Sequence, residues 1–209
     1  MATTSAKENI LKKIRQALSN PVPLPFSQSE GTQSVFHQST EDNAIDFAES
    51  FGTLQGKFVY CPNQEELISQ LSNLIQLRQW TNIYCQETNF LPILNSLNIT
   101  PHDTLATCDV SITGCEFLVA RTGTIVMSSA QESGRTTSVY APIHICIAFG
   151  NQLGYDLKDA LQFIKAKYSN NIPSLITFAS GPSRTADIEK TLVTGVHGPK
   201  EVYCFLVDL

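Results

Sequence analysis

The sequence predicts an α/β fold in which a parallel-rich central sheet is covered by helices on both faces. Short apolar segments rich in β-branched residues alternate with amphipathic segments of ten or more residues. This alternation is typical of parallel strands joined by crossover helices. The chain of 209 residues is long enough for one sizeable domain with its own core. Its hydrophobic fraction of 42% is that of a globular protein.

Residues 1–40 are expected to hold one amphipathic helix followed by a flexible linker. The apolar residues of this helix fall on one stripe: Ile10, Leu11, Ile14 and Leu18. Ser5 and Glu8 form a candidate capping box at its start. The segment after Pro21 is rich in Pro, Ser and Gln and has no periodicity. The α/β domain is therefore expected over residues 41–209.

Strands and helices alternate through this domain. Strands are expected at residues 57–61, 81–85, 108–112, 116–120, 124–128, 143–149, 174–179 and 202–207. The link Arg121-Thr122-Gly123 indicates a hairpin between the fourth and fifth of these strands. Helices are expected at residues 40–51, from Asn63, through Phe90 and Leu94, and at residues 156–168. The residues expected to point inward include Ile45, Phe47, Ala48, Leu157, Leu161, Ile164 and Tyr168.

Composition excludes several classes of function. The net charge of -5 and the pI near 5.3 argue against a nucleic-acid surface, because phosphate binding needs clustered Lys and Arg. No apolar stretch approaches the roughly 20 residues of a transmembrane helix, so no membrane insertion is expected. The polar N-terminus lacks a secretory apolar region, which indicates a cytoplasmic location. The chain has neither a GxGxxG nor a P-loop motif.

Six cysteines raise the question of a metal site. They are widely spread, and no pair has the two-residue spacing with which one loop grips a metal. Cys146 and Cys204 lie inside apolar runs, where cysteine behaves as a small hydrophobic residue. The sequence therefore predicts reduced structural thiols and no metal or cluster in this chain.

The segment from Ser180 to Pro199 is the first candidate site. It follows a predicted strand, and we expect it to start a helix with Ser183 or Thr185 as N-cap. The free N–H groups of such a helix, with the charge of Arg184, can hold a carboxylate. Acidic residues in the same turn, Asp187 and Glu189, disfavour a polyphosphate. The alternative is an ordinary helix start.

His197 lies between glycines in the second half of that segment. Its ordinary pKa near neutrality suits a general acid or base. The alternative is a loop histidine that bonds backbone carbonyls.

The second candidate segment contains Thr122, Gly123 and Arg135. Arg135 follows a polar loop, where it can bind an acid or remain an ordinary surface arginine. Glu116 and Glu132 are candidate nucleophiles, although neither has an activating neighbour in sequence. His144 alternates with apolar residues and is expected to be a buried, hydrogen-bonded core histidine.

Two motifs in these segments resemble those of the lactate utilisation protein C (LutC/YkgG) family and its LUD domain. The run GPSRTADIEKTLVTGVHGP is similar to that family's C-terminal signature. The run RTGTIVMSS, followed by Gly134-Arg135 and APIHICIA, resembles its central motif. One departure is Arg121, which stands where the family often has an acidic residue, so no carboxylate is expected to act at that position.

The resemblance implies a fold like that of ribose-5-phosphate isomerase, glucosamine-6-phosphate deaminase and CoA-transferases (NagB/RpiA/CoA-transferase-like). It also implies a role in converting L-lactate to pyruvate together with iron–sulfur partner proteins. The chain would then be a subunit without a cofactor of its own, with the iron–sulfur clusters in its partners. Ser183, Arg184 and Thr185 would hold the hydroxy acid, and Arg135 and His197 would line the same cleft.

Two other functions stay open at this point. The first is a stand-alone enzyme of the CoA-transferase or formyltetrahydrofolate cyclo-ligase type, which would need Glu116 or Glu132 in the cleft. The second is an adaptor that binds its partners through the N-terminal helix and linker.

Overall fold

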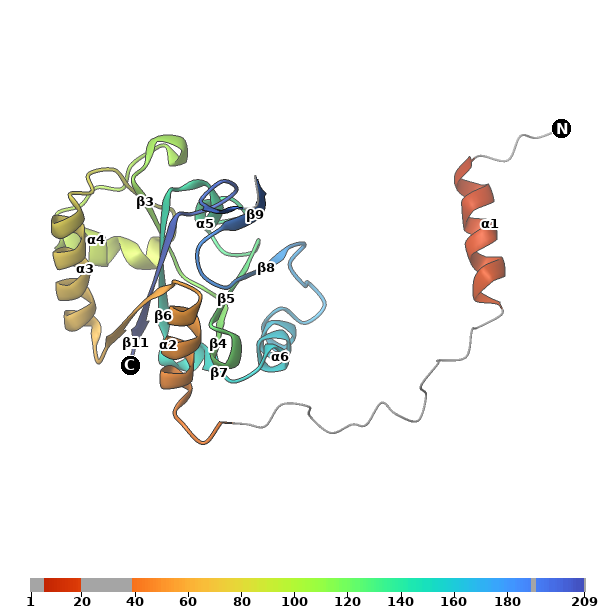
Figure 1. Ribbon diagram of the computed structural model, residues 1–209, viewed down its shortest axis with the longest axis horizontal. Coiled ribbons are helices and arrows are strands. Elements are labelled where there is room, and N and C mark those ends of the chain that lie inside the picture. The colour runs from red at the N-terminus through yellow and green to blue at the C-terminus, as the bar shows by residue number, and fades with distance from the viewer. Residues whose placement is uncertain (1–5, 20–38, 189–190, 209) are drawn as a thin grey trace. The chain divides into compact units, whose positions relative to one another are not determined.

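The computed structural model of the chain describes residues 6–19, 39–188 and 191–208 (Figure 1). It divides into two units, Met1–Gln38 and Ser39–Leu209, which are described separately. The helices are α1 (Ala6–Leu18), α2 (Asn43–Thr53), α3 (Gln64–Arg78), α4 (Leu91–Ser96), α5 (Thr137–Tyr140) and α6 (Leu157–Tyr168). The strands are β1 (Lys57–Cys61), β2 (Ile83–Cys85), β3 (Val110–Thr113), β4 (Phe117–Val119), β5 (Thr124–Ser128), β6 (Ile143–Phe149), β7 (Leu153–Gly154), β8 (Ile176–Ala179), β9 (Arg184–Ile188), β10 (Thr191–Thr194) and β11 (Glu201–Val207).

The first unit contributes α1, which forms where the amphipathic pattern predicts a helix. None of its residues is buried, and the whole apolar stripe is exposed. Ser5 of the candidate capping box and residues 20–38 of the expected linker lie outside the described residues.

The second unit is built on a five-stranded sheet in the order β1-β11-β6-β3-β2. Every neighbouring pair in this sheet is parallel. The prediction of a parallel-rich central sheet is therefore confirmed. β1 and β6 begin and end at the predicted residues, because short apolar runs between polar turns mark buried strands well.

α3 and α4 cover one face of this sheet. Ile145 and Ile147 of β6 point to that face, with Phe205 of β11, and pack against Leu67 and Leu71 of α3. α3 begins as predicted: the Asn63 side-chain oxygen accepts the backbone N–H of Glu66 at 2.8 Å.

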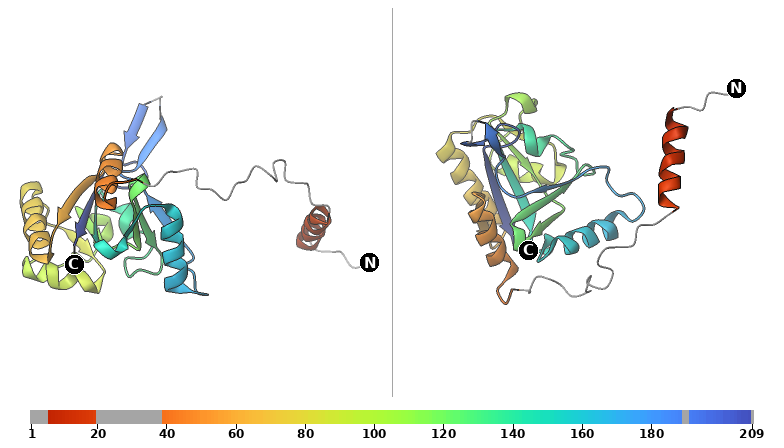
Figure 2. Two further views of the ribbon diagram at one scale, coloured as in Figure 1. Left: turned by 90° about the horizontal axis from the view of Figure 1, so that it is seen from below. Right: turned by 45° about the vertical axis from the view of Figure 1, so that its right-hand side comes forward.

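Helices alone were expected on the opposite face as well, but a second sheet covers it together with α2. Cys146 and Ala148 point to this face and pack against Phe47 of α2 and against Leu118 and Ile125 of a second sheet. That sheet has the order β7-β4-β5-β8, and α6 covers its outer side (Figures 1 and 2). The expected 116–128 hairpin is confirmed as β4 and β5, but it belongs to this separate sheet.

Two residues expected to point inward are half exposed. Ile45 on α2 is 50% exposed and Leu161 on α6 is 49% exposed. α6 instead packs Ala160 and Ile164 against Phe117 of β4. The apolar stripe of such a helix is wide, so the sequence alone leaves open which of its residues are buried. On α6 the contact with β4 decides it in favour of Ala160 and Ile164.

The helix expected after Ser183 is not present. Arg184–Ile188 and Thr191–Thr194 form an antiparallel pair of strands, β9 and β10. The β-branched residues of this segment favour strands, and glycines with positive φ bound it: Gly181 at +86° and Gly195 at +80°. The predicted helix N-terminus for an acid is therefore wrong.

Candidate functional site

A cavity of about 260 Å³ lies between the two sheets, at the amino ends of β6 and β11. We call it the motif cavity. Its lining comes from Met127, Ser138, Val139, His144, residues 177–183, residues 197–199 and Val202. The two ends of the C-terminal motif, GPS at residues 181–183 and HGP at residues 197–199, thus meet in one cavity.

Backbone hydrogen bonds hold the two ends of this motif together. The N–H of Ser183 donates to the carbonyl of Pro199 at 2.9 Å, and the N–H of Gly195 donates to the carbonyl of Ser183 at 2.9 Å. Gly198 permits this approach, because a Cβ there would lie 2.9 Å from the Cβ of Ser183. Ser183 and His197 consequently line the same cavity.

His144 is the buried polar residue of the motif cavity. It is 1% exposed, and its Nε2 lies 2.8 Å from the Thr113 hydroxyl. In the tautomer with its proton on Nε2, His144 donates to that hydroxyl, the hydroxyl donates to the Gly114 carbonyl, and Nδ1 is left as an acceptor. Burial lowers the pKa of His144 to about 4, so its imidazole is neutral at physiological pH. The prediction of a buried, hydrogen-bonded histidine is confirmed, but its position in the cavity was missed.

His197 is exposed and also lines an adjoining cavity of about 470 Å³. Tyr140 and Lys200 line this second cavity. An imidazole and an ammonium group therefore lie beside the motif cavity, and both can bind an acid.

Thr122 lies at a third cavity, of about 320 Å³, next to the motif cavity. Its hydroxyl is 2.7 Å from that of Thr124, and the Thr124 hydroxyl is 2.7 Å from that of Ser180. Ser180 lines both cavities. A chain of three hydroxyl groups therefore links the hairpin turn to the motif cavity.

Comparison with known proteins identifies the domain that builds this site. The model of the LUD domain matches residues 98–207, which include every residue of the motif cavity. The chain belongs to the LUD domain family. The resemblance predicted from the two motifs is therefore confirmed.

Relatives of this LUD domain protein include lactate utilization protein C of Deinococcus radiodurans, which is 25% identical over 99% of this chain and 97% of that protein. Lactate utilization protein C of Bacillus subtilis is 36% identical over 48% of this chain and 42% of that protein. An uncharacterized protein of Neisseria meningitidis serogroup B is 26% identical over 95% of this chain and 91% of that protein.

The crystal structure of a DUF162 family protein from Deinococcus radiodurans shares the fold. Its TM-score is 0.57 at 17% identity, over 79% of this chain and 94% of that one. No helix among the described residues of the LUD domain protein is long and apolar enough to cross a membrane.

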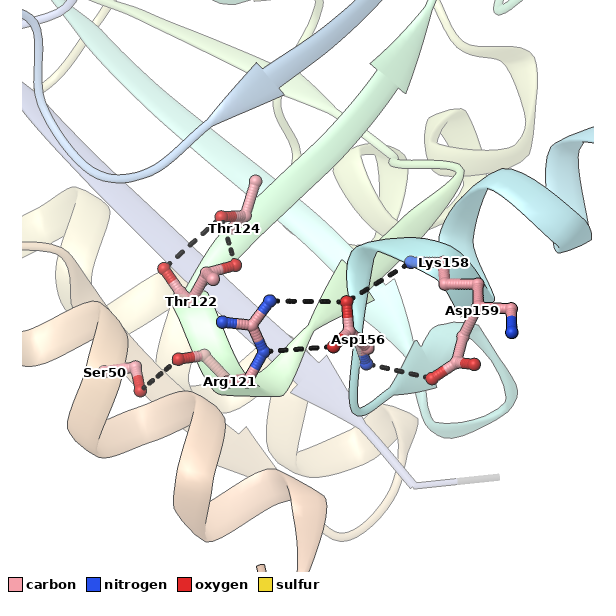
Figure 3. A network of polar contacts seen from close by, with 7 residues as sticks. All are labelled: Ser50, Arg121, Thr122, Thr124, Asp156, Lys158 and Asp159. Carbon is pink, nitrogen blue, oxygen red and sulfur yellow. Dashed lines mark hydrogen bonds and ion pairs between the residues drawn. The ribbon is translucent and has the colours of Figure 1, made fainter. Parts of the chain in front are cut away.

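Arg121 pairs with a carboxylate at the start of α6. Its Nε and Nη2 lie 3.1 and 3.3 Å from the two carboxylate oxygens of Asp156, the N-cap of α6 (Figure 3). The hydrogen bonds from Arg121, opposed by partial burial, lower the pKa of this carboxyl group. Arg121 therefore ties the β4–β5 turn to the start of α6.

The other predicted site residues lie apart from the motif cavity. Arg184 donates a hydrogen bond to the carbonyl of Leu54, the C-cap of α2, where a cation is favourable. Arg135 donates to the Ser174 hydroxyl at 2.5 Å. Thr185 pairs with Val193 in the β9–β10 hairpin. Gly123 packs against the backbone of Phe51 on α2. The motif cavity of this LUD domain is lined by Ser183 and His197 but not by Arg135 or Arg184.

Glu116 and Glu132 lie toward the opposite edge of the central sheet, beside the carboxyl end of β3. Glu116 is fully buried and accepts hydrogen bonds from Ser128, Lys167 and Tyr168 at 2.6 to 2.7 Å. Burial raises its pKa, but these hydrogen bonds outweigh burial and the pKa is lowered. Glu116 is therefore an enclosed ion-pair partner, whereas Glu132 lines a separate cavity of about 420 Å³.

All six cysteines of this LUD domain protein are free and buried. Cys146 and Cys204 are direct neighbours on β6 and β11. Within residues 6–19, 39–188 and 191–208, no three His, Cys, Asp or Glu side chains are placed to hold a metal ion.

Proposed function

We propose that this protein serves lactate utilisation as a subunit that acts with iron–sulfur partner proteins, and that the motif cavity binds the 2-hydroxy acid. A relative that matches 99% of this chain carries the name lactate utilization protein C, and so do relatives that match about half of it. One structural observation carries the assignment of the site: the segments that resemble the family motifs converge on a single cavity between the sheets.

The chemistry of the cavity suits a small hydroxy acid. Its carboxylate accepts hydrogen bonds, which the hydroxyls of Ser180 and Ser183 and the imidazole of His197 can donate. Its 2-hydroxyl group donates one, which the unprotonated Nδ1 of His144 can accept. Ser183 therefore keeps the substrate-binding role predicted from sequence, whereas His197, predicted as a general acid or base, here serves as a hydrogen-bond donor to the carboxylate.

The two predicted arginines receive different roles in this proposal. Arg184 stabilises the end of α2, and Arg135 holds the loop at Ser174. They support the architecture around the site and do not touch the acid.

We also propose that the chain carries no cofactor and that the iron–sulfur clusters lie in its partners. The spacing of the six cysteines supports this division, because no pair in the sequence has the separation of a cluster-binding motif. Oxidation of the hydroxy acid would then pass its electrons to the partner proteins.

The test is lactate-dependent dye reduction under anaerobic conditions by the complex assembled with its iron–sulfur partners. Ser183→Ala and His197→Gln are each expected to raise KM for lactate by about tenfold or more, since each removes a hydrogen bond to a charged group. Arg135→Gln is the matched control and should leave KM unchanged. A complex that oxidises lactate equally well without this chain would contradict the proposal and favour a transferase or cyclo-ligase that uses Glu132.

A further inference from the structure

A second polar cavity lies at the carboxyl ends of the central strands, whereas the motif cavity lies at their amino ends. It has a volume of about 420 Å³ and is formed where β2, β3 and β6 end. We call it the carboxylate cavity, after Glu87 and Glu132 in its lining; Gly114, Phe90, Phe149 and Lys167 also line it. The carboxyl ends of parallel strands are the usual place for ligands in such sheets.

Glu87 is the central group of this cavity. It is 7% exposed, and its Oε1 accepts the backbone N–H of Gly114 at 3.0 Å. Gly114 makes room for this carboxylate, because a Cβ there would lie 2.9 Å from Glu87 Oε2. Burial raises the pKa of Glu87, although hydrogen bonds from Ser133 and Gly114 oppose it.

No cation neutralises Glu87 within the described part of the chain. The ion pairs found there are Lys57–Glu201, Arg78–Glu201, Arg121–Asp156 and Lys167–Glu116. A buried carboxylate without a counter-ion is costly. Burial disfavours the charged form of Glu87, and a cation bound beside it would offset that cost.

The other charged groups around the cavity do not supply a counter-ion for Glu87 either. Lys167 is committed to Glu116, with Nζ 2.7 Å from its Oε2. Glu132 adds a second carboxylate next to Glu87, since it accepts the backbone N–H of Thr88 at 2.6 Å. The ammonium group of Lys167 and the carboxylates of Glu87, Glu116 and Glu132, when all are ionised, leave an excess of two negative charges around the cavity.

This excess selects the class of ligand. An anion such as lactate would be repelled. A bare divalent metal ion would need more ligands, and no group of three metal-ligating side chains is found among the residues that the structure describes. An organic cation fits both the charge and the apolar wall, to which Phe90, Ile147 and Phe149 contribute.

We propose that the carboxylate cavity binds an organic cation through an ammonium or guanidinium group held between Glu87 and Glu132. The group belongs either to a free amine or to a Lys or Arg side chain of a partner protein. This site goes beyond the proposed function and does not depend on it, because it lies at the other edge of the sheet and takes a ligand of opposite charge.

The test is a titration of the full-length, nitrogen-15-labelled protein followed by NMR. The backbone amide of Gly114 is the reporter, because it donates directly to Glu87. Agmatine is the cationic probe, 1-butanol its neutral counterpart and sodium lactate the anionic one. We expect a saturable shift of the Gly114 amide with agmatine and none with the other two.

Glu87→Gln is the decisive variant, because glutamine keeps an oxygen for the Gly114 N–H and removes the charge. The dissociation constant for agmatine should rise by at least about tenfold. The affinity of wild type should also weaken on acidification as Glu87 is protonated, and this pH dependence should be smaller in the variant, which keeps only the carboxylate of Glu132. Glu65→Gln on the exposed start of α3 is the matched control and should bind like wild type.

A short Gly-Ser peptide with one central arginine separates the two sources of the cation. Tighter binding of the peptide than of agmatine supports a partner side chain, and the reverse supports a free amine. The proposal is overturned by a Gly114 amide that does not respond to either probe at millimolar concentration. It is equally overturned by unchanged agmatine binding in Glu87→Gln or by a saturable response to lactate.

Discussion

Two buried polar residues show how burial and hydrogen bonding together set the charge state of a side chain. His144 and Glu116 are both inaccessible to solvent, yet one is kept neutral and the other charged. His144 has a hydroxyl partner and no carboxylate, so burial dominates. Glu116 has an ammonium and two hydroxyl groups around it, and these outweigh burial. The same degree of burial therefore gives opposite outcomes because the partners differ.

The neutral state of His144 predicts a pH dependence of stability. Its pKa is about 4 in the folded protein, below the ordinary 6.5, so the unfolded state binds more protons between these values. The free energy of unfolding should fall as pH drops from about 6.5 to about 4, by up to about 3 kcal/mol. Urea denaturation followed by circular dichroism at several pH values measures this slope.

His144→Gln provides the comparison for that slope. Glutamine can still bond the Thr113 hydroxyl but does not titrate. The slope between pH 6.5 and 4 should become shallower in the variant, whatever its absolute stability. An identical slope in both proteins would show that other groups cause it.

The β4–β5 hairpin shows how one turn connects several elements. Gly123 has a φ of +54°, and its neighbour Arg121 reaches Asp156 at the start of α6 (Figure 3). The carbonyl of Arg121 also accepts the Ser50 hydroxyl of α2 at 3.3 Å. The turn therefore contacts α2 on one side and α6 on the other.

Gly123→Ala is expected to be strongly destabilising because two costs combine. The positive φ disfavours any side chain, and the new Cβ would lie 2.4 Å from the Phe51 backbone nitrogen. We expect the free energy of unfolding to fall by about 2–4 kcal/mol. Gly134→Ala is the matched control, since Gly134 has a φ of +65° with open space around it, and it should cost about 1 kcal/mol. Equal losses in chemical denaturation would refute the contact with α2.

Across the second unit, buried charge joins segments that are distant in sequence. Glu116 precedes β4, and its partners Lys167 and Tyr168 end α6, about fifty positions later. The ion pair lies where the second sheet, α6 and the carboxylate cavity meet. It fixes the end of α6 against the second sheet at the wall of that cavity.

Lys167→Met should destabilise the protein in a pH-dependent way. In wild type the pKa of Glu116 is lowered, so its contribution is present above the ordinary value of 4.5 and lost as pH falls through the folded pKa. Without Lys167, burial is opposed only by the hydrogen bonds from Ser128 and Tyr168, so the pKa of Glu116 is higher than in wild type and the variant loses less stability on acidification. At pH 7 the loss should be about 1–3 kcal/mol, because Lys167 is 48% exposed and partly screened.

Thermal unfolding at pH 7 and pH 4 measures this difference, which should shrink at the lower pH. Lys165→Met, two positions earlier at an exposed site on α6, is the control and should stay within about 0.5 kcal/mol of wild type. A loss for Lys167→Met that does not depend on pH would mean that the side-chain packing of Lys167, and not its charge, matters.

The sequence alone determined the parallel sheet, the 116–128 hairpin and the family to which the chain belongs. These features rest on patterns within a few residues: short apolar runs between polar turns, the capping of α3 by Asn63, and the two contiguous motifs. Local patterns suffice wherever the interacting residues are neighbours in the chain.

The arrangement in space decided the rest. The strand pair at residues 184–194 replaced an expected helix, because its β-branched residues and bounding glycines prevail over an apparent N-cap. Arg184 faces the end of α2, about 130 positions earlier, and Glu87 meets Gly114 across two strands. Such contacts depend on which elements pack together, and that packing follows from burying apolar surface of the whole domain, which no short stretch of sequence encodes.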